Sequence, residues 1–399
     1  MGEFIADAAA RMHGVTIPSS LAIMSRVREM RSQGIEVISF NSRGDTPRRA
    51  KQAAIAMLET TAAAGYTDVR GTLALREAIA RKLKRENGIA ADPASEIMVT
   101  AGGMAGIFST LLALTDRGDE VLLTDPGWLG FEPMIRVAGA SPIRIPLLRR
   151  DGFGFDVEAL RRAITSRTKL LILCNPDNPT GIVFERAELE AIAEIAREFN
   201  LLVVMDEAYE NFIFDGRAHV SMAALDGMKR RTITIHTVSK IHNMFGWRVG
   251  WVVAHADVIK PILAVHSCAV SCPTSFAQAG AAAVLDGSTG EGDLPFATIL
   301  RNYQDRRDAM VGALRRIPGV ECGTPQGAYF LFPNFSHFGM TSVELSMHLL
   351  EIGHVATTPG SSFGATGEGH LRLVFNAPIA ELEQGVAQIS DALSTLRLR

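Results

Sequence analysis

The stretch "TVSKIHNMFGWRVGW" at residues 237–251 holds two isolated cations between two apolar segments. Lys240 follows the run "RTITIH", whose β-branched residues predict a buried strand, and Arg248 opens a second run of this kind, "RVGWVV". Burying an unpaired ammonium costs free energy. Either partners elsewhere in the chain neutralise these charges, or the lysine loses its proton.

Helical and extended segments alternate on both sides of this stretch. Between the predicted strands lie segments with helical patterning, such as "LALREAIARKLKREN" and "RAELEAIAEIAREF". Near-continuous apolar strands are typical of a sheet that is covered by helices on both faces. The sequence therefore predicts an α/β domain with a mostly parallel sheet. Its expected strands are 96–101, 119–125, 141–148, 169–175, 201–207, 231–237 and 248–254.

The pattern of predicted helices and strands changes after about residue 290, which indicates a second, smaller α+β domain. It contains a helical pattern at 299–316, strands around "GAYFLF" and "HLRLVF", and a last helix from Ala380. We expect an N-terminal arm with part of the small domain at 1–44, a large domain at 45–290, and the rest of the small domain at 291–399. The small domain is then built from both ends of the chain.

Composition excludes several classes of protein. The 399 residues are 47% hydrophobic and 21% charged, with a net charge of −3, which does not suit a nucleic-acid surface. Four scattered cysteines predict neither a disulfide scaffold nor a zinc site. No signal peptide or sustained apolar span is evident, so we expect a cytoplasmic protein without a membrane or nucleic-acid partner.

Polar residues follow five of the predicted strands at the points where these strands end. Because ligands bind at the carboxyl ends of parallel strands, these residues are expected to share one crevice. They are Gly102-Gly103, Asp125 to Trp128, Asn175 to Gly181, Asp206 and Lys240.

These residue types suit one particular ligand chemistry. A desolvated lysine near another cation can attack a carbonyl to form a Schiff base. A phosphate would find donors in Arg248, Thr237 and Ser239 and in the free N–H groups after Gly102-Gly103. A pyridine ring would need a carboxylate, a flat stacking face and donors to its phenolic oxygen. Asp206, Trp128, Tyr209 and Asn178 have that chemistry.

With these residues in this order, the chain resembles the fold-type I, pyridoxal-phosphate-dependent aminotransferases of class I/II, a group that includes aspartate aminotransferases. The resemblance covers nearly the whole chain. It implies transfer of an amino group from an L-amino acid to a 2-oxo acid by a ping-pong mechanism, with pyridoxal 5′-phosphate as cofactor. The matching segments are "VTIPSS", "YTDVRGTLALREAIA", "NPDNPTG", "DEAYE", "SK…GWRVGW", "PQGAYF" and "HLRLVF".

The resemblance also implies a role for each matching residue. Lys240 would hold the cofactor as a Schiff base and then shuttle a proton between the substrate Cα and C4′ of the cofactor. Asp206 would pair with the pyridinium nitrogen, Tyr209 and Asn178 would bind the phenolic oxygen, and Trp128 would stack on the ring. Phosphate binding would fall to Arg248, Thr237, Ser239 and the backbone of Gly103 and Met104.

The same resemblance implies a substrate site and a homodimer. Arg372 would grip the substrate α-carboxylate, with Asn178 and Trp128 beside it. Tyr66 matches a tyrosine that reaches the phosphate of the neighbouring subunit, so two subunits would share their active sites. Arg43 departs from the family pattern, and it could contact a second substrate carboxylate or point to solvent.

Two alternative functions remain open at this point. A carbon–sulfur β-lyase of the same fold would use the same Cα chemistry without an oxo acid. A non-catalytic regulator of this fold would need an additional N-terminal DNA-binding domain, for which the sequence before residue 15 leaves no room. His236, His242 and His266 are not spaced as metal ligands, and we expect neutral, structural histidines there.

Overall fold

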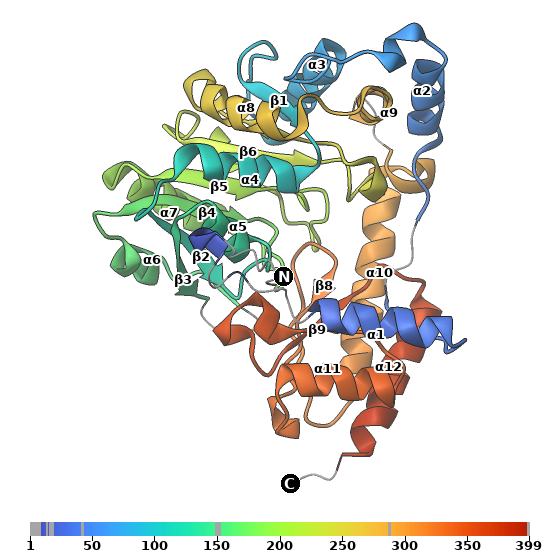
Figure 1. Ribbon diagram of the computed structural model, residues 1–399. Coiled ribbons are helices and arrows are strands. Elements are labelled where there is room, and N and C mark those ends of the chain that lie inside the picture. Colours follow the sequence, from blue (N-terminus) through green and yellow to red (C-terminus); the bar gives the residue numbers. More distant parts are fainter. Residues whose placement is uncertain are drawn as a thin grey trace, which may run out of the picture.

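A seven-stranded sheet forms the larger part of the protein in this computed structural model, which describes residues 9–12, 15, 20–40, 44–147, 153–285 and 289–396 (Figure 1). The strand order is β1-β7-β6-β5-β4-β2-β3. Only β7 runs antiparallel to its neighbours, so the predicted, mostly parallel sheet is confirmed. The strands are β1 (Ile97–Thr100), β2 (Glu120–Asp125), β3 (Ser141–Pro146), β4 (Thr168–Cys174), β5 (Leu202–Asp206), β6 (Thr232–Thr237) and β7 (Gly250–Val253).

The strand β7 begins two residues later than the sequence predicts. Arg248 has a left-handed backbone with φ of 54°, which ends the extended run on its N-terminal side. The guanidinium is therefore carried by a turn and not by the sheet, which lets it lie over the sheet edge.

Alternate residues along the central strands enter different cores, as expected for a sheet buried on both faces. In β4, Leu170 and Ile172 pack on one face, while Leu171 and Leu173 pack on the other. Helices α4 (Gly103–Leu114), α5 (Phe131–Val137) and α8 (Ala256–Val270) cover the first face. The opposite face is covered by α3 (Leu73–Lys82), α6 (Val157–Ala163), α7 (Arg186–Glu198) and α9 (Ser275–Leu285), and α2 (Arg48–Leu58) packs on α9.

A smaller α+β unit is built from both chain ends, as predicted. Its antiparallel sheet has the order β8-β10-β9. The blue helix α1 lies beside the orange α11 in Figure 1, and Arg26 of α1 binds Glu351 of α11 at 2.6 Å and 2.9 Å. Its elements are α1 (Ser20–Ser32), α10 (Phe296–Leu314), β8 (Phe330–Leu331), α11 (Ser342–Glu351), β9 (Thr358–Pro359), β10 (Leu371–Val374) and α12 (Ile379–Ser394).

The helices are too short or too polar to cross a lipid bilayer, as far as the described residues go. Residues 262–285, an uncharged run in the sequence, form most of α8 and α9 and pack on the sheet and on α2.

Gly250 is the tightest point between the sheet and the start of α4. A Cβ at this position would lie 2.6 Å from Gly103 N and 2.7 Å from Gly102 C, and backbone atoms there have no room to move away. We predict that Gly250→Ala lowers the free energy of unfolding by about 1–3 kcal/mol, because overpacking strains the backbone. Chemical denaturation measures this change.

Gly312 provides the matched control. It lies inside α10, and the nearest atom to an added Cβ is 3.9 Å away, at the end of a flexible arginine. Gly312→Ala should raise the free energy of unfolding by roughly 0.5–1 kcal/mol, since alanine is the better helix former. Equal effects of the two substitutions would contradict the packing argument.

Candidate active site

A cavity with about 600 Å³ of empty space, part of it open to solvent, lies at the carboxyl ends of the parallel strands. It brings together all the predicted cofactor residues except Tyr66, although they come from widely separated parts of the chain. Its lining consists of Gly103, Met104, Ile107, Trp128, Asn178, Asp206, Ala208, Tyr209, Thr237, Ser239, Lys240, Phe245 and Arg248.

Lys240 presents its amine to aromatic faces. The Nζ atom lies 5.1 Å from the ring centroid of Tyr209 and 5.1 Å from that of Phe245. Across the described part of the chain, Nζ forms no ion pair with a carboxylate. An amine in such a place is available as a nucleophile once it is deprotonated.

Asp206 ends β5 and points into the same cavity. Its carboxylate accepts the N–H of Ala208 at 3.1 Å. Burial raises the pKa of Asp206 to about 6, although the charges of Lys240 and His236 oppose that rise. The carboxyl group is therefore mostly ionised at neutral pH, as a partner of a protonated ring nitrogen must be.

Tyr209 follows Asp206 by three residues and is buried. Burial raises the pKa of its phenol well above the usual value, so the hydroxyl keeps its proton and can donate a hydrogen bond. Trp128 lines the cavity, and its indole makes an edge-to-face contact with Phe131 at 5.1 Å and 82°, which holds the ring in place.

An anion pocket forms where Arg248 meets the start of α4. Gly102 precedes this helix, and a Cβ there would clash with the Arg248 guanidinium, so only glycine permits the close approach. Nη1 of Arg248 donates to the Phe245 carbonyl at 2.9 Å. The hydroxyls of Thr237 and Ser239, which line the same cavity, lie 2.8 Å apart. Together these groups offer the donors that a phosphate needs.

Arg372 lies beside the cavity and contacts Asn178, which lines it. Its Nη1 donates to Asn178 Oδ1 at 2.9 Å, and its guanidinium lies between the rings of Phe330 and Phe363, at 4.7 Å and 4.9 Å. Nε is buried without a partner. Burial lowers the pKa of Arg372. A carboxylate would satisfy the unpaired donor and the charge at once.

These observations fit pyridoxal 5′-phosphate. The cavity offers an amine without an ion pair, a carboxylate that is ionised at neutral pH, a flat aromatic face, and a cationic pocket at a helix start. The orphaned Nε of Arg372 adds a place for a substrate carboxylate next to them.

Some predicted residues lie elsewhere, and some lining residues were not predicted. Tyr66 is 91% exposed on the surface, and Arg43 lies outside the described residues. Phe245 of the cavity wall, and the two rings that hold Arg372, were missed. An isolated phenylalanine gives no sequence signal that separates a site wall from an ordinary core position.

Comparison with known proteins agrees with this arrangement. The family model "Aminotransferase class I and II" matches residues 35–389. A probable aspartate/prephenate aminotransferase of Aquifex aeolicus is 37% identical over 396 residues, which cover 97% of the chain and 99% of that relative. The solved aspartate aminotransferase of Rhizobium meliloti has a TM-score of 0.91 at 31% sequence identity. The match covers 98% of this chain and 100% of the Rhizobium chain.

A second solved structure, an aromatic aminotransferase of Pyrococcus horikoshii OT3, has a TM-score of 0.85 at 34% identity. The match covers 94% of this chain and 100% of the Pyrococcus chain. These relatives are named as aminotransferases, which favours amino transfer over the β-lyase reaction that the sequence left open.

The raised pKa of Asp206 predicts how the stability of the cofactor-free protein depends on pH. Its carboxyl binds a proton more tightly in the folded chain than in the unfolded chain, where the pKa is near 3.8. Its contribution to stability is therefore largest below pH 3.8 and is lost as the pH rises through about 6. Asp206→Asn should stabilise the protein by roughly 2 kcal/mol at pH 7.5 and by much less at pH 4.5.

Urea unfolding at both pH values measures this effect. Asp391→Asn is the control, because Asp391 lies on the exposed side of α12 and its removal should change little at either pH. A gain for Asp206→Asn that is the same at pH 4.5 and pH 7.5 would refute the raised pKa.

Proposed function

The chain belongs to the class I and II aminotransferases, and from that premise we propose that its cavity binds pyridoxal 5′-phosphate between Trp128 and Asp206, with Lys240 as the catalytic amine. The enzyme transfers an amino group from an L-amino acid to a 2-oxo acid. The observation that carries the proposal is the position of Lys240, whose amine lies among aromatic rings in the cavity that the Asp206 carboxylate also lines.

Each of these cavity residues has a separate role in the proposed reaction. Pyridoxal phosphate, when bound, supplies a carbonyl carbon and a ring that withdraws electrons from the substrate Cα. Asp206 would pair with the protonated ring nitrogen, and the neutral phenol of Tyr209, with the Asn178 amide, would donate to the phenolic oxygen. Lys240 Nζ would accept the proton of the substrate Cα and deliver it to C4′ of the cofactor.

The phosphate end is held by fixed donors. Arg248, the hydroxyls of Thr237 and Ser239, and the backbone N–H groups of Gly103 and Met104 surround the pocket at the start of α4. Gly102 lets the guanidinium of Arg248 approach the backbone at the start of α4. A dianion placed there is stabilised by both the guanidinium charge and the helix start.

Arg372 binds the substrate α-carboxylate in this proposal, with Asn178 and Trp128 beside it. The rings of Phe330 and Phe363 pack on the guanidinium of Arg372 and hold it in place. A carboxylate would therefore bind to N–H donors that are already oriented. The relatives are named for aspartate, prephenate and aromatic amino acids, so aspartate and the aromatic amino acids are the donors we propose first.

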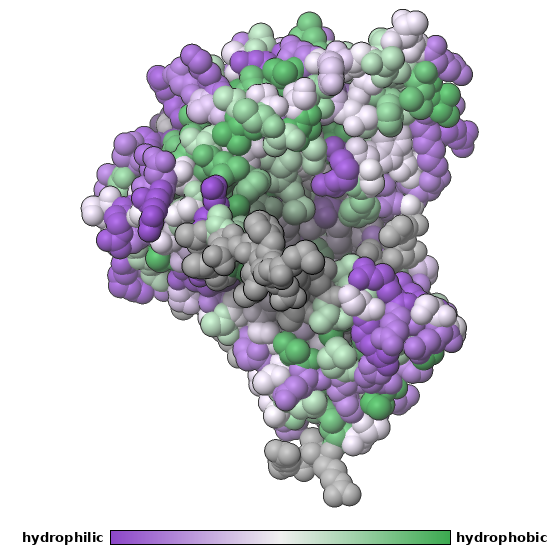
Figure 2. Space-filling view, viewed as in Figure 1, coloured by the Kyte–Doolittle hydropathy of each residue, from purple (hydrophilic) through white to green (hydrophobic). Residues whose placement is uncertain are grey.

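We also propose a homodimer with shared active sites. Exposed apolar side chains gather on α2 and on the segment that follows it: Ile55 and Leu58 are 56% and 55% exposed, and Tyr66 and Leu73 follow. Figure 2 shows this apolar area over α2 at the upper right. A second subunit on this surface would cover the patch and bring Tyr66 to a neighbouring cavity.

Two sequence predictions are carried forward as proposals. The domain boundaries at residues 44 and 290 are supported by the two separate sheets. A cytoplasmic location is supported by the cysteines, all of which are free thiols: Cys174, Cys268, Cys272 and Cys322.

Amino transfer is tested by the half-reaction. The protein loaded with pyridoxal phosphate should lose its visible absorbance when an amino donor is added alone and regain it when a 2-oxo acid follows. Lys240→Ala should abolish both the Lys-dependent absorbance and turnover, because the attacking amine is gone. Lys260→Ala, at an exposed position of α8, is the control and should behave as the parent does. Unchanged absorbance across a panel of aspartate, glutamate and aromatic donors would contradict amino transfer.

Arg372 is tested by a substitution that keeps its charge. Arg372→Lys should lower kcat/KM about 100-fold, mainly through KM, because an ammonium cannot replace two parallel donors. Steady-state kinetics separate the two constants. Arg217→Lys, at a surface ion pair with Glu185, serves as the matched control. A KM that stays within twofold of the parent value would remove Arg372 from the substrate site.

A further inference from the structure

The loop that follows β4 carries Asn178 to the cavity and closes on itself around Asp177. The N–H of Asp177 donates to the Ile182 carbonyl at 2.9 Å, and the Asp177 carbonyl accepts from the Gly181 N–H at 3.0 Å. Both backbone groups of Asp177 are therefore bonded inside the loop. Asn178 is the next residue along the chain, so these bonds fix the backbone from which its side chain starts.

The side chain of Asp177 adds a third connection across the same loop. The residue is fully buried, and its Oδ2 accepts from Thr180 Oγ1 at 2.5 Å and from the Thr180 N–H at 3.1 Å. Its other oxygen, Oδ1, is buried and finds no partner within the described part of the chain. A single carboxyl oxygen thus closes the turn that contains Asn178 and Pro179.

The far end of the loop is bound to the segment that leads into β8. The Gly181 carbonyl accepts from the N–H groups of Gln326 and Gly327, at 2.9 Å and 2.8 Å. A Cβ on Gly181 would lie 2.5 Å from Pro325 Cβ, and the residue has φ of 71°, so glycine is required there. With one end fixed in this way, the bonds of Asp177 determine how the turn at Asn178 is held.

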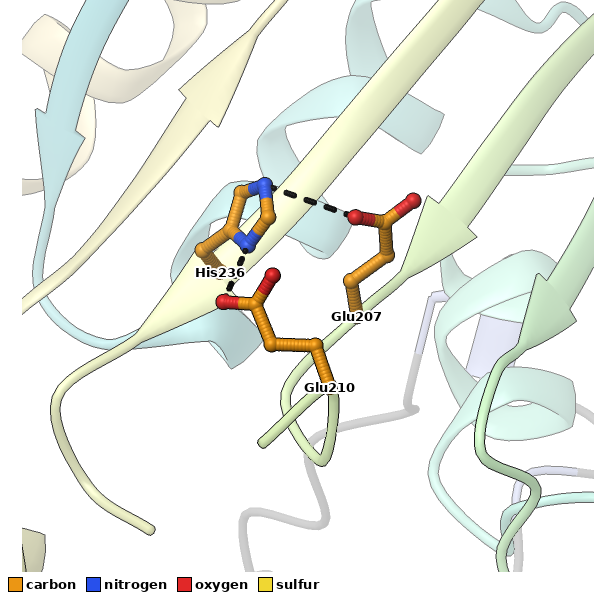
Figure 3. Close-up of side chains that lie close together, drawn as sticks. All are labelled: Glu207, Glu210 and His236. Carbon is orange, nitrogen blue, oxygen red and sulfur yellow. Dashed lines mark hydrogen bonds and ion pairs between the residues drawn. The ribbon is translucent and has the colours of Figure 1, made fainter. Parts of the chain in front are cut away.

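Other buried carboxylates of the large sheet have partners that offset their charge. Figure 3 shows Glu207 and Glu210 beside His236, whose Nδ1 lies 3.2 Å from Glu210 Oε1. Lys82 Nζ also binds Glu210, and His219 Nε2 lies 3.1 Å from Glu207 Oε2. The carboxylates of that cluster are therefore compensated within it.

Asp177 has no such partner. Among the residues that the structure describes, no basic side chain lies within ion-pair distance of its carboxyl. Burial raises the pKa of Asp177 to about 7, although the hydrogen bonds from Thr180 oppose that rise. Since no ion pair accounts for this buried acid, its contribution is the pair of hydrogen bonds that it accepts from Thr180.

The loop holds the Asn178 amide at a point where two contacts meet. Asn178 is 3% exposed and lines the cavity, and its Oδ1 accepts from Arg372 Nη1 at 2.9 Å. In the proposed function, the same amide donates to the phenolic oxygen of the cofactor. A small displacement of the loop would disturb both contacts, because both belong to one short side chain.

We propose that Asp177 is a positioning residue, which holds the Asn178 amide between Arg372 and the cavity by closing the loop onto Thr180. This role deepens the proposed function and rests on the part that Asn178 has in it. The acid itself touches neither the substrate nor the cofactor.

Three variants separate the hydrogen bonds of Asp177 from its charge. Asp177→Asn keeps an acceptor oxygen without the charge, Asp177→Ala removes the acceptor, and Thr180→Val removes one of the two donors. Crystal structures of the cofactor-free variants should retain the 2.9 Å contact between Asn178 and Arg372 in Asp177→Asn and lose it in Asp177→Ala. An amide that stays in place in Asp177→Ala would overturn the proposal, whatever reaction the enzyme catalyses.

The loaded enzyme gives readouts that a purely structural role would not move. Asp177→Ala should lower kcat/KM by roughly 10- to 100-fold, and Thr180→Val should lie between it and the parent. The pH midpoint of the visible absorbance should rise in Asp177→Ala, because the ionised phenolic oxygen loses a donor. Asp177→Asn should restore the midpoint and bring kcat/KM to within about threefold of the parent value.

Thr234→Val is the matched control for Thr180→Val. Thr234 is also buried, in β6, but its hydroxyl has no hydrogen-bond partner in the described structure. Its replacement should leave kcat/KM and the absorbance midpoint unchanged. Equal values in the two valine variants would show that the bond from Thr180 to Asp177 has no part in function.

The parent enzyme separates this proposal from the proposed function. If the loaded parent responds to no amino donor, the reaction is wrong, and the crystal structures still decide whether Asp177 positions Asn178. If the parent reacts and Asp177→Ala reacts equally well, amino transfer stands and the role of Asp177 is wrong. Should Asp177→Ala fail to fold, the comparison of Thr180→Val with Thr234→Val decides by the same readouts.

Discussion

Asp206 ends the central strand of a sheet whose interior excludes water, and burial there raises the pKa of its carboxyl to about 6. A ring nitrogen can stay protonated only beside a carboxylate that stays charged, so the cavity works only where other charges oppose that rise. The N–H of Ala208 and the charge of Lys240 both do so. The groups around this strand end thus set the charge of the Asp206 carboxyl.

The second requirement is close approach at the phosphate end, and it is met by the backbone. Gly102 and Gly250 lack the Cβ atoms that would push the guanidinium of Arg248 and the start of α4 apart. Arg248 reaches this point from a left-handed turn, which strand geometry could not have provided. In the proposed function, Lys240 and Arg248 would meet two neighbouring groups of one ligand, its carbonyl carbon and its phosphate.

Sequence reasoning could predict the sheet and most of the cavity, because apolar runs mark strands and parallel strands bring their carboxyl ends together. It could not find the partners of His236. Spacing along the chain does not show that Glu207, Glu210 and His236 meet, because they come from two strands that pair only in the fold. A neutral structural histidine is a fair prediction for His242, because burial lowers its pKa to about 3.

Asn178 joins the two ends of the proposed site. Its Oδ1 accepts from Arg372 Nη1 at 2.9 Å, and the same residue lines the cavity. One side chain thereby fixes the distance between the α-carboxylate fork and the ring-binding cavity. Because the fork is clamped between Phe330 and Phe363, which belong to the smaller unit, substrate binding depends on how that unit packs against the large sheet. In the proposed function, substrate selection and ring orientation would therefore be linked through the Asn178 amide.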